Sequence, residues 1–123
     1  MKFYICNHCK NLVYMVKDVG VPIVCCGQKM EELKANTVEA SGEKHIPVAK
    51  FENGVVSVNV GSVDHPMLPE HYIEWVALET EKGSQIVYLK PEQKPSAEFC
   101  VGDDKPVAVY AYCNLHGLWK SEI

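Results

Sequence analysis

Residues 51–60, which read FENGVVSVNV, decide the fold of this chain. Asn53 and Gly54 both tolerate positive φ, and such a pair ahead of an alternating run is the strongest short-range signal for a β-hairpin. After the pair, apolar and polar residues alternate up to Val60, as they do in a half-buried strand. The stretch therefore predicts two antiparallel strands with one face directed toward a core.

The chain beyond this hairpin repeats the same signals. Residues 72–78 and 85–89 alternate well enough to be half-buried strands, and residues 107–112 have the β-branched and aromatic bias of an inner strand. Turn residues lie between strands at 82–83 and 102–105. About seven short strands with frequent turns predict an all-β fold, a β-sandwich, without a helix of useful length.

The N-terminal part has a different character. Residues 1–36 hold four of the six cysteines and are predicted to form a separate small domain. A piece shorter than about 40 residues generally needs a disulfide, a metal ion or a partner to fold. Residues 12–16 and 21–24 are predicted to be two short strands joined by a turn at 18–20. A helical turn is predicted near residues 31–34.

The composition limits the classes of partner. The chain has 123 residues, a net charge of −4 and no arginine, which does not favour a nucleic-acid partner. No apolar run approaches the ~20 residues of a membrane span, and the N-terminal sequence MKFYICNHCK lacks the pattern of a signal peptide. We therefore expect a cytoplasmic protein with neither a nucleic-acid nor a membrane partner.

Four cysteines near the N-terminus have the spacing of a metal site: Cys6, Cys9, Cys25 and Cys26. Two residues separate the first pair, and the second pair follows after a further fifteen residues, enough for a short hairpin. Four thiolates suit a tetrahedral zinc ion or a single iron ion. A structural zinc ribbon is the main competing interpretation, and disulfides are a lesser one in a reducing compartment. His8, inside the first turn, is expected to be an exposed loop residue.

A second set of donors is spread over the rest of the chain: His45, His65, His71, Cys113 and His116. His65 and His71 flank a turn-forming segment that can direct both rings toward one point. Cys113 and His116 can chelate as a local unit. Five such donors exceed the four of a structural zinc site, and imidazoles with one thiolate suit a redox metal, iron or copper. Four histidines in a plane and Cys113 on the axis would leave one position for a small molecule.

Both parts of the chain resemble known families. The first segment, with adjacent cysteines in VCCGQKM, is similar to desulforedoxin, which binds one iron through four cysteines. The motifs EKHIP, HYIEW and C-N-x-H-G-x-W resemble those of superoxide reductase, or neelaredoxin. The whole chain resembles desulfoferrodoxin, the two-iron form. The resemblance implies a rubredoxin- or desulforedoxin-like iron domain over residues 1–36 and an immunoglobulin-like β-sandwich catalytic domain over residues 37–123.

The resemblance also implies roles for individual residues. One mononuclear iron would have the four cysteines as ligands, where zinc can replace it. The other would have the four histidines of the second set as equatorial ligands and Cys113 as the axial thiolate. Glu43 and Lys44 would lie on a mobile loop beside the open position. Lys44 would attract the superoxide anion, and Glu43 would be able to occupy the sixth position of the oxidised iron.

The implied activity is the one-electron reduction of superoxide to hydrogen peroxide, without release of oxygen. Rubredoxin or a similar small carrier would supply the electrons, and a homodimer is expected. A non-enzymatic two-iron electron carrier and a zinc-ribbon interaction module remain as alternatives. Cys100 is expected to pack in a strand as a small apolar residue, and Trp75, Trp119, Tyr110 and Tyr112 are expected to be structural.

Overall fold

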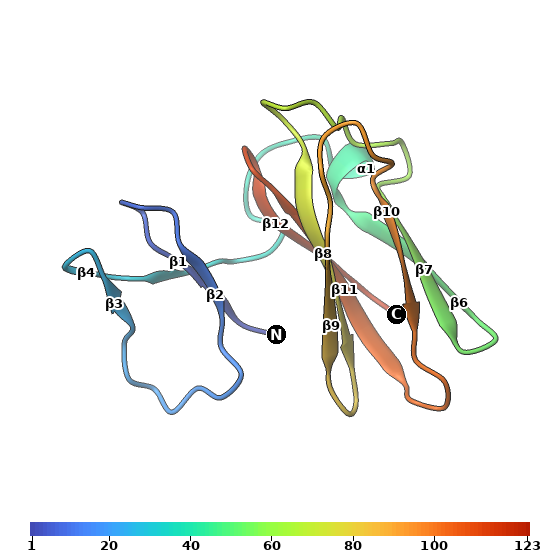
Figure 1. Ribbon diagram of the computed structural model, residues 1–123, viewed down its shortest axis with the longest axis horizontal. Helices are drawn as coiled ribbons and strands as arrows, with labels where there is room; N and C mark the ends of the chain where they lie inside the picture. The colour runs from blue at the N-terminus through green and yellow to red at the C-terminus, as the bar shows by residue number, and fades with distance from the viewer. The chain divides into compact units, whose positions relative to one another are not determined.

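The computed structural model describes residues 1–123, and the chain divides into two compact units. Unit 1 comprises Met1–Lys34 and unit 2 comprises Ala35–Ile123 (Figure 1). Strands form nearly all of the regular structure in both units. No helix is long and apolar enough to cross a membrane.

Unit 2 is a sandwich of two antiparallel layers. One layer has the strand order β10-β7-β6 and the other has the order β12-β11-β8-β9. The strands are β6 (Pro47–Glu52), β7 (Val55–Val60), β8 (Ile73–Thr80), β9 (Ser84–Tyr88), β10 (Ser96–Cys100), β11 (Pro106–Cys113) and β12 (Gly117–Glu122). A single four-residue helix, α1 (Gly42–His45), precedes β6. The predicted all-β sandwich is confirmed.

The predicted hairpin joins β6 to β7. Asn53 and Gly54 have φ angles of 52° and 74°, and Glu52 pairs with Val55 directly across the turn. Because both central residues adopt positive φ, the turn matches the twist of the flanking strands. Strand β7 begins and ends at the predicted residues, and β8, β9 and β11 cover the other three predicted strands with slightly different ends.

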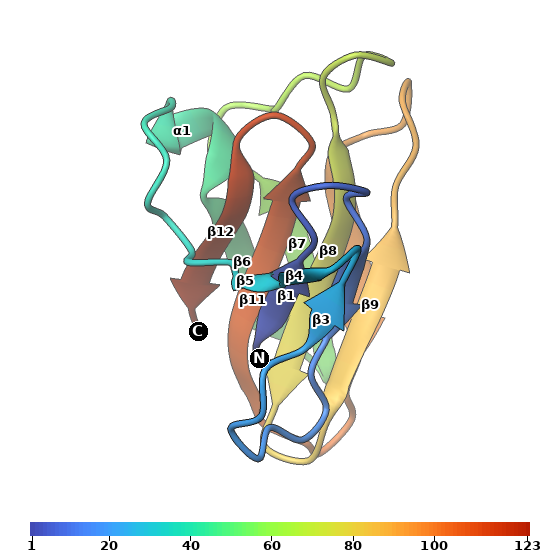
Figure 2. The same ribbon diagram turned by 90° about the vertical axis from the view of Figure 1, so that its left-hand side faces the viewer.

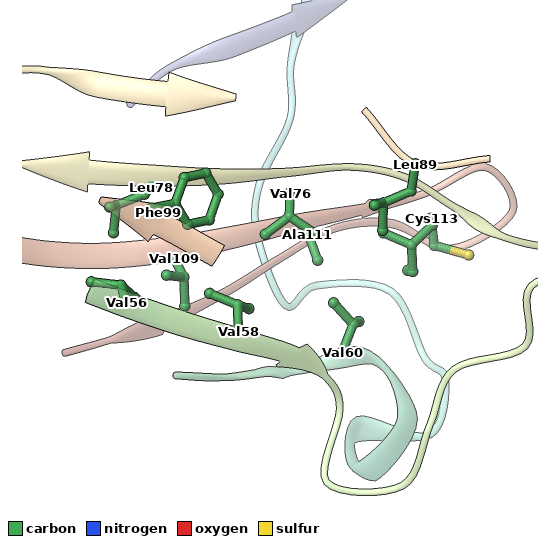
Figure 3. Close-up of a cluster of buried hydrophobic side chains, with 11 residues drawn as sticks. Val56, Val58, Val60, Val76, Leu78, Leu89, Phe99, Val109, Ala111 and Cys113 are labelled. Carbon is green, nitrogen blue, oxygen red and sulfur yellow. The ribbon is translucent and has the colours of Figure 1, made fainter. Parts of the chain in front are cut away.

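The core lies between the two layers. The alternation in β7 directs Val56, Val58 and Val60 into it, and none of them is more than 2% exposed. They face buried side chains of β8 and β11 across the sandwich (Figure 3). Cys113 lies at one end of this cluster, and its sulfur points away from the other labelled side chains (Figure 3). The apolar core therefore ends at a residue that can donate to a metal.

The connections between the strands of unit 2 gather at its two ends. At one end, the backbone N–H of Val101 donates to the carbonyl of Gly54, and that of Glu81 donates to the carbonyl of Lys105. The opposite end carries α1, the β7–β8 connection and the β11–β12 turn (Figure 2). All five donors of the second set come from this opposite end.

Unit 1 contains two small sheets, with the strand orders β2-β1-β5 and β3-β4. The strands are β1 (Phe3–Ile5), β2 (Leu12–Tyr14), β3 (Val24–Cys25), β4 (Gln28–Lys29) and β5 (Glu31–Glu32). Phe3, Cys6 and Met30 are its buried apolar residues. So few buried side chains supply little stability, which agrees with the need for a metal ion in a piece of this size.

Two predictions for unit 1 are wrong. Residues 21–24 do not pair with residues 12–16, because β2 pairs with β1 and Val24 pairs with Lys29. The exposed fraction of Val21 is 68%, so this apolar run has no buried face. The helical turn expected near residues 31–34 is instead strand β5, which pairs with β1. In both cases a distant strand decides the structure, and local composition does not reveal that strand.

Candidate metal centres

The first two cysteines lie on a tight turn after β1. The backbone N–H of Lys10 donates to the carbonyl of Cys6 at 2.9 Å, and the N–H of Cys6 donates to the carbonyl of Asn11 at 2.9 Å. Lys10 has a φ of 68°, which closes the turn. The sulfur of Cys9 then lies 3.6 Å from the sulfur of Cys25. The turn therefore directs this pair toward the β3–β4 hairpin.

The adjacent pair Cys25–Cys26 is explained by the turn between β3 and β4. Successive side chains of a strand point to opposite faces, so two adjacent cysteines in a strand could not share one ion. Here Cys26 and Gly27 have φ angles of 52° and 72°, and Cys25 pairs with Gln28 across them. The left-handed backbone of Cys26 rotates its side chain, and the two sulfur atoms lie 4.0 Å apart.

The four sulfur atoms fit one tetrahedral ion. They all lie within 4.8 Å of one another. At a metal–sulfur distance of about 2.3 Å, tetrahedral sulfur atoms are about 3.8 Å apart. Hydrogen bonding from the backbone N–H of Cys9 lowers the pKa of Cys6 to about 6, whereas hydrogen bonding with the Cys9 thiol raises the pKa of Cys26 to about 12. Without a cation, the four thiols cannot all ionise near neutral pH.

The structure brings the second set of donors together. Helix α1 carries His45, the β7–β8 connection carries His65 and His71, and the β11–β12 hairpin carries Cys113 and His116. The donor atoms of the first three histidines and Cys113 lie within 4.8 Å of one another. His116 joins them through Nδ1, which lies 3.1 Å from Nε2 of His45 and 3.8 Å from Sγ of Cys113.

The four imidazole rings form a square. Its sides are the centroid distances His45–His65, His65–His71, His71–His116 and His116–His45, which are 4.6, 4.7, 5.1 and 4.9 Å. Neighbouring ring planes meet at 80°, 83°, 78° and 83° in the same order. Along one diagonal, the centroids of His45 and His71 are 6.3 Å apart. This is the arrangement of four imidazoles around a common centre.

The distances between donor atoms fit a metal at that centre. Nε2 of His65 lies 3.1 Å from Nε2 of His45. Two nitrogen donors at right angles around a metal, each about 2.1 Å from it, would be about 3.0 Å apart. Nε2 of His71 is buried and has no hydrogen-bond partner, which is rare for a buried polar atom. A metal ion bound by the square would satisfy it.

Backbone carbonyls hold two of the rings from behind. Nδ1 of His45 lies 2.7 Å from the carbonyl oxygen of Ser41, and Nδ1 of His65 lies 2.6 Å from that of Pro66. With Nδ1 as the donor, each ring turns its Nε2 lone pair toward the centre, as is usual for metal-binding histidines. Trp119 lies against the ring of His45 with a centroid distance of 4.8 Å. Sequence reasoning missed the two carbonyl contacts because backbone acceptors leave no residue-type signal.

Electrostatics favour the metal-binding form of the histidines. Burial lowers the pKa of His65 to about 4, and burial also lowers the pKa values of His45 and His71. These imidazoles are therefore neutral at neutral pH, the form that binds a metal. Burial raises the pKa of the Cys113 thiol, so this side chain needs a nearby cation to become a thiolate.

Glu43 and Lys44 lie on α1, immediately before His45, and so belong to a helical turn. The side chains of Glu43 and Lys44 are both exposed. The carbonyl of Glu43 accepts hydrogen bonds from the backbone N–H of Val63 at 2.9 Å and from the Ser62 hydroxyl at 3.2 Å. The β7–β8 connection therefore holds the backbone of this turn in place.

Gly61 is a further residue of this region that sequence reasoning missed. A Cβ atom at this position would lie 2.5 Å from the carbonyl oxygen of Glu43 and 3.0 Å from that of Ile46. The absence of a side chain therefore lets α1 approach the end of β7. A glycine directly after the β7 strand was the one available signal for this close approach.

The remaining candidate residues lie outside both clusters. His8 is exposed, as predicted. Cys100 lies in a strand, as predicted, but the prediction that it packs as a small apolar residue is wrong, because it is exposed on β10. Its neighbour Phe99 is 1% exposed and occupies the core-facing position, so the alternation of the strand turns Cys100 outward. Trp75 and Trp119 are buried, as predicted.

A β-sandwich with a square of four imidazoles and a buried thiol, joined to a four-cysteine unit, defines a class of non-haem metalloprotein. The family model described as Desulfoferrodoxin matches residues 37–122. A desulfoferrodoxin from Nitratidesulfovibrio vulgaris is 45% identical over 121 residues, covering 98% of this chain and 95% of that protein. The chain belongs to the desulfoferrodoxin family.

Solved structures agree with this assignment. The superoxide reductase from Treponema pallidum is 38% identical, with a TM-score of 0.82 and coverage of 98% of both chains. A one-iron superoxide reductase from Giardia intestinalis is 32% identical, with a TM-score of 0.57. It covers 66% of this chain and 97% of its own. The first protein therefore shares the fold over nearly the whole of this chain, and the second shares it over about two thirds.

Proposed function

We propose that this protein is a superoxide reductase that detoxifies superoxide. The observation that carries the proposal is the square of four imidazoles with Cys113 as the fifth donor. One of the four, His71, has a buried Nε2 without a hydrogen-bond partner. The reaction is O₂•⁻ + e⁻ + 2H⁺ → H₂O₂, and no oxygen is released. Ferrous iron, when bound by these donors, supplies the electron.

The protein's own groups prepare the site for this chemistry. Because the imidazoles of His45, His65 and His71 are neutral, the net charge of the site would come from the iron and the thiolate. Cys113, as a thiolate, would be the fifth residue to hold the iron and would supply it with electron density. Burial raises the pKa of this thiol, and hydrogen bonding from the backbone N–H groups of Leu115 and His116 lowers it in part. Solvent supplies the two protons.

Lys44 and Glu43 have the proposed role of handling charged ligands beside the iron. Superoxide is a small anion, and the exposed ammonium of Lys44, next in sequence to His45, would raise its local concentration. Glu43 offers a carboxylate from the same helical turn to the oxidised iron. Neither role requires α1 to unfold, because only the side chains must reach the site.

The four-cysteine unit has the proposed role of a second, mononuclear iron site. We assign residues 1–36 to a desulforedoxin-like domain and residues 37–123 to the catalytic domain. The sulfur geometry equally suits zinc, so the metal of this site depends on the supply of ions. Iron at this site would be able to relay electrons, and either ion would stabilise the fold of the unit.

The partners follow from the reaction. Since each cycle consumes one electron, a small redox protein such as rubredoxin must re-reduce the iron.

We also propose a homodimer, because unit 1 exposes four valines that a second copy could cover: Val16, Val19, Val21 and Val24, with exposed fractions of 84%, 73%, 68% and 63%. A cytoplasmic location is supported by the six free cysteines. Light scattering coupled to gel filtration tests the dimer.

Stopped-flow mixing of the reduced, iron-loaded protein with superoxide tests the function. A reductase yields one peroxide for each superoxide consumed and releases no oxygen. Equal yields of peroxide and oxygen would identify a dismutase instead. An electron carrier without an accessible site would not accelerate superoxide decay beyond the rate in buffer, and its spectrum would not respond to azide.

A further inference from the structure

The ring of His71 lacks the carbonyl contact that holds two other rings of the square. His45 and His65 each have an Nδ1 atom within 2.7 Å of a backbone carbonyl. His116 follows Cys113 on a short turn, and its carbonyl accepts a hydrogen bond from Nε1 of Trp119 at 3.1 Å. No hydrogen bond of this kind holds the ring of His71, whose Nε2 is unpaired. Its position must therefore be set by the backbone that carries it.

That backbone is bound on both sides of His71 by one side chain, Asn114. The backbone N–H of Tyr72 donates to Oδ1 of Asn114 at 2.9 Å, and Nδ2 of Asn114 donates to the carbonyl of Glu70 at 3.0 Å. The backbone N–H of Asn114 also donates to the carbonyl of Tyr72 at 3.2 Å. The amide thus replaces a strand partner for the residues before and after His71.

These three hydrogen bonds join two separate parts of the site. The backbone of His71 pairs only with Leu68, at 2.9 and 3.0 Å, and this pairing stays within the β7–β8 connection. Asn114 belongs to the β11–β12 turn, between Cys113 and His116. A displacement of His71 relative to the other two donors would therefore have to break the hydrogen bonds of Asn114.

We propose that Asn114 is a positioning residue that fixes His71 relative to Cys113 and His116. The inference rests on the proposed function only in taking the five donors as an iron site. Asparagine suits this role because its amide both donates and accepts, whereas a carboxylate only accepts and an alanine does neither. Outer partners of metal ligands typically change metal affinity by about 10- to 100-fold when they are lost.

The chain contains a matched control in Asn36. Its Nδ2 donates to the carbonyl of Lys120 at 3.0 Å, its Oδ1 accepts from the N–H of Lys120 at 2.9 Å, and its own N–H donates to the carbonyl of Leu118 at 3.0 Å. This is the same three-bond pattern on β12, and none of its partners is a donor of the site. Because Asn36 has a φ of 62°, Asn36→Gly removes the amide without adding backbone strain.

The experiment measures iron release from the full-length protein into excess EDTA, followed by the absorption of the five-donor site. Asn114→Ala should release this iron about 10- to 100-fold faster than the unsubstituted protein, and Asn114→Asp, which keeps the acceptor for Tyr72, should be intermediate. The electron paramagnetic resonance spectrum of the oxidised site should change its symmetry in both variants. Asn36→Gly should lower the thermal midpoint comparably but leave release and spectrum unchanged within about twofold.

Two outcomes would overturn the role of Asn114. Release from both Asn114 variants at the unsubstituted rate would show that His71 needs no such support. Equal acceleration in Asn36→Gly would show that global stability alone controls release. If Asn114→Ala does not fold, Asn114→Asp decides alone, through its release rate and spectrum. Failure of the proposed function is distinguishable, because it would appear in the unsubstituted protein as missing iron at the five-donor site or as oxygen release from superoxide.

Discussion

His116 turns Nδ1, not Nε2, toward Nε2 of His45, at a distance of 3.1 Å. His45 and His65 instead turn Nε2 inward, and these two atoms lie 3.1 Å apart. Because His116 follows Cys113 by only three residues, its backbone is already close to the centre, and the nearer ring nitrogen is the one that reaches it. The Cys-x2-His spacing therefore also determines which nitrogen donates.

Substituting Cys113 by serine should abolish the thiolate-to-iron charge-transfer absorption of the oxidised protein. An alkoxide or hydroxyl oxygen does not give the same transition, and the buried serine would remain protonated. The visible spectrum of iron-loaded protein measures this directly. Cys100→Ser is the control, because Cys100 is an exposed cysteine outside both clusters and its loss should leave the band intact. Survival of the band in Cys113→Ser would exclude this residue as a ligand.

Lys44→Ala should slow the reaction with superoxide by about two- to tenfold at low ionic strength, since one attracting charge near the site is lost. The rate should also depend less on salt, because screening acts on the interaction that has been removed. Stopped-flow measurements over a series of salt concentrations test both effects. Lys50→Ala, on β6 beside Glu52, is a control for net charge. Equal slowing by both variants would assign the effect to the whole protein and not to Lys44.

Gly61→Ala should displace α1, because the new Cβ would lie 2.5 Å from the carbonyl oxygen of Glu43. Overpacking of this kind costs about 1–3 kcal/mol. We expect a lower free energy of unfolding in denaturant and faster loss of iron from the five-donor site. Gly83→Ala is the matched control, since nothing lies within 4 Å of the corresponding Cβ position. A stable Gly61→Ala protein with normal iron retention would show that α1 can shift without consequence.

Cys9→Ser should release the metal of unit 1 and unfold that unit, because only a few of its side chains are buried. The reaction of pre-reduced protein with superoxide should keep its rate, since the five donors all belong to unit 2. Circular dichroism and single-turnover kinetics separate the two effects. A slower single-turnover reaction would contradict the prediction that unit 1 takes no part in the reaction with superoxide. Slower re-reduction by rubredoxin alone would show that the metal of unit 1 relays electrons.

The stability of unit 2 should fall at alkaline pH through Tyr110. Burial raises its pKa to about 12, and its hydroxyl donates to Oε1 of Glu79 at 3.0 Å. An unfolded tyrosine loses its proton near pH 10, so between about pH 10 and 12 the unfolded chain binds fewer protons than the folded chain. The free energy of unfolding therefore decreases across this window. Tyr110→Phe should lack this decrease, which is on the order of 1 kcal/mol between pH 9 and 11. Denaturant unfolding at a series of pH values measures it, and the same pH dependence in both proteins would refute the prediction.

The sequence predicts local features of unit 2 well and long-range pairing in unit 1 poorly. Asn53-Gly54 and the alternation after it determine β7 because turn chemistry and a buried face agree there. Val21 belongs to an apolar run without a buried face, and the pairing of β1 with both β2 and β5 follows from contacts that no local pattern contains. The donors themselves could be found by residue type. The Ser41 carbonyl that orients His45 could not, and the role of Gly61 was signalled only by its position directly after a strand.

The five donors of unit 2 come from three chain connections at one end of the sandwich. An ion shared among them would therefore act as a reversible cross-link between segments that are far apart in sequence. Cross-links of this kind lower the entropy of the unfolded chain, and the gain grows with the length of chain they enclose. Loading with iron should then slow amide hydrogen exchange in all three connections together, while the hairpin turns at the opposite end continue to exchange as before.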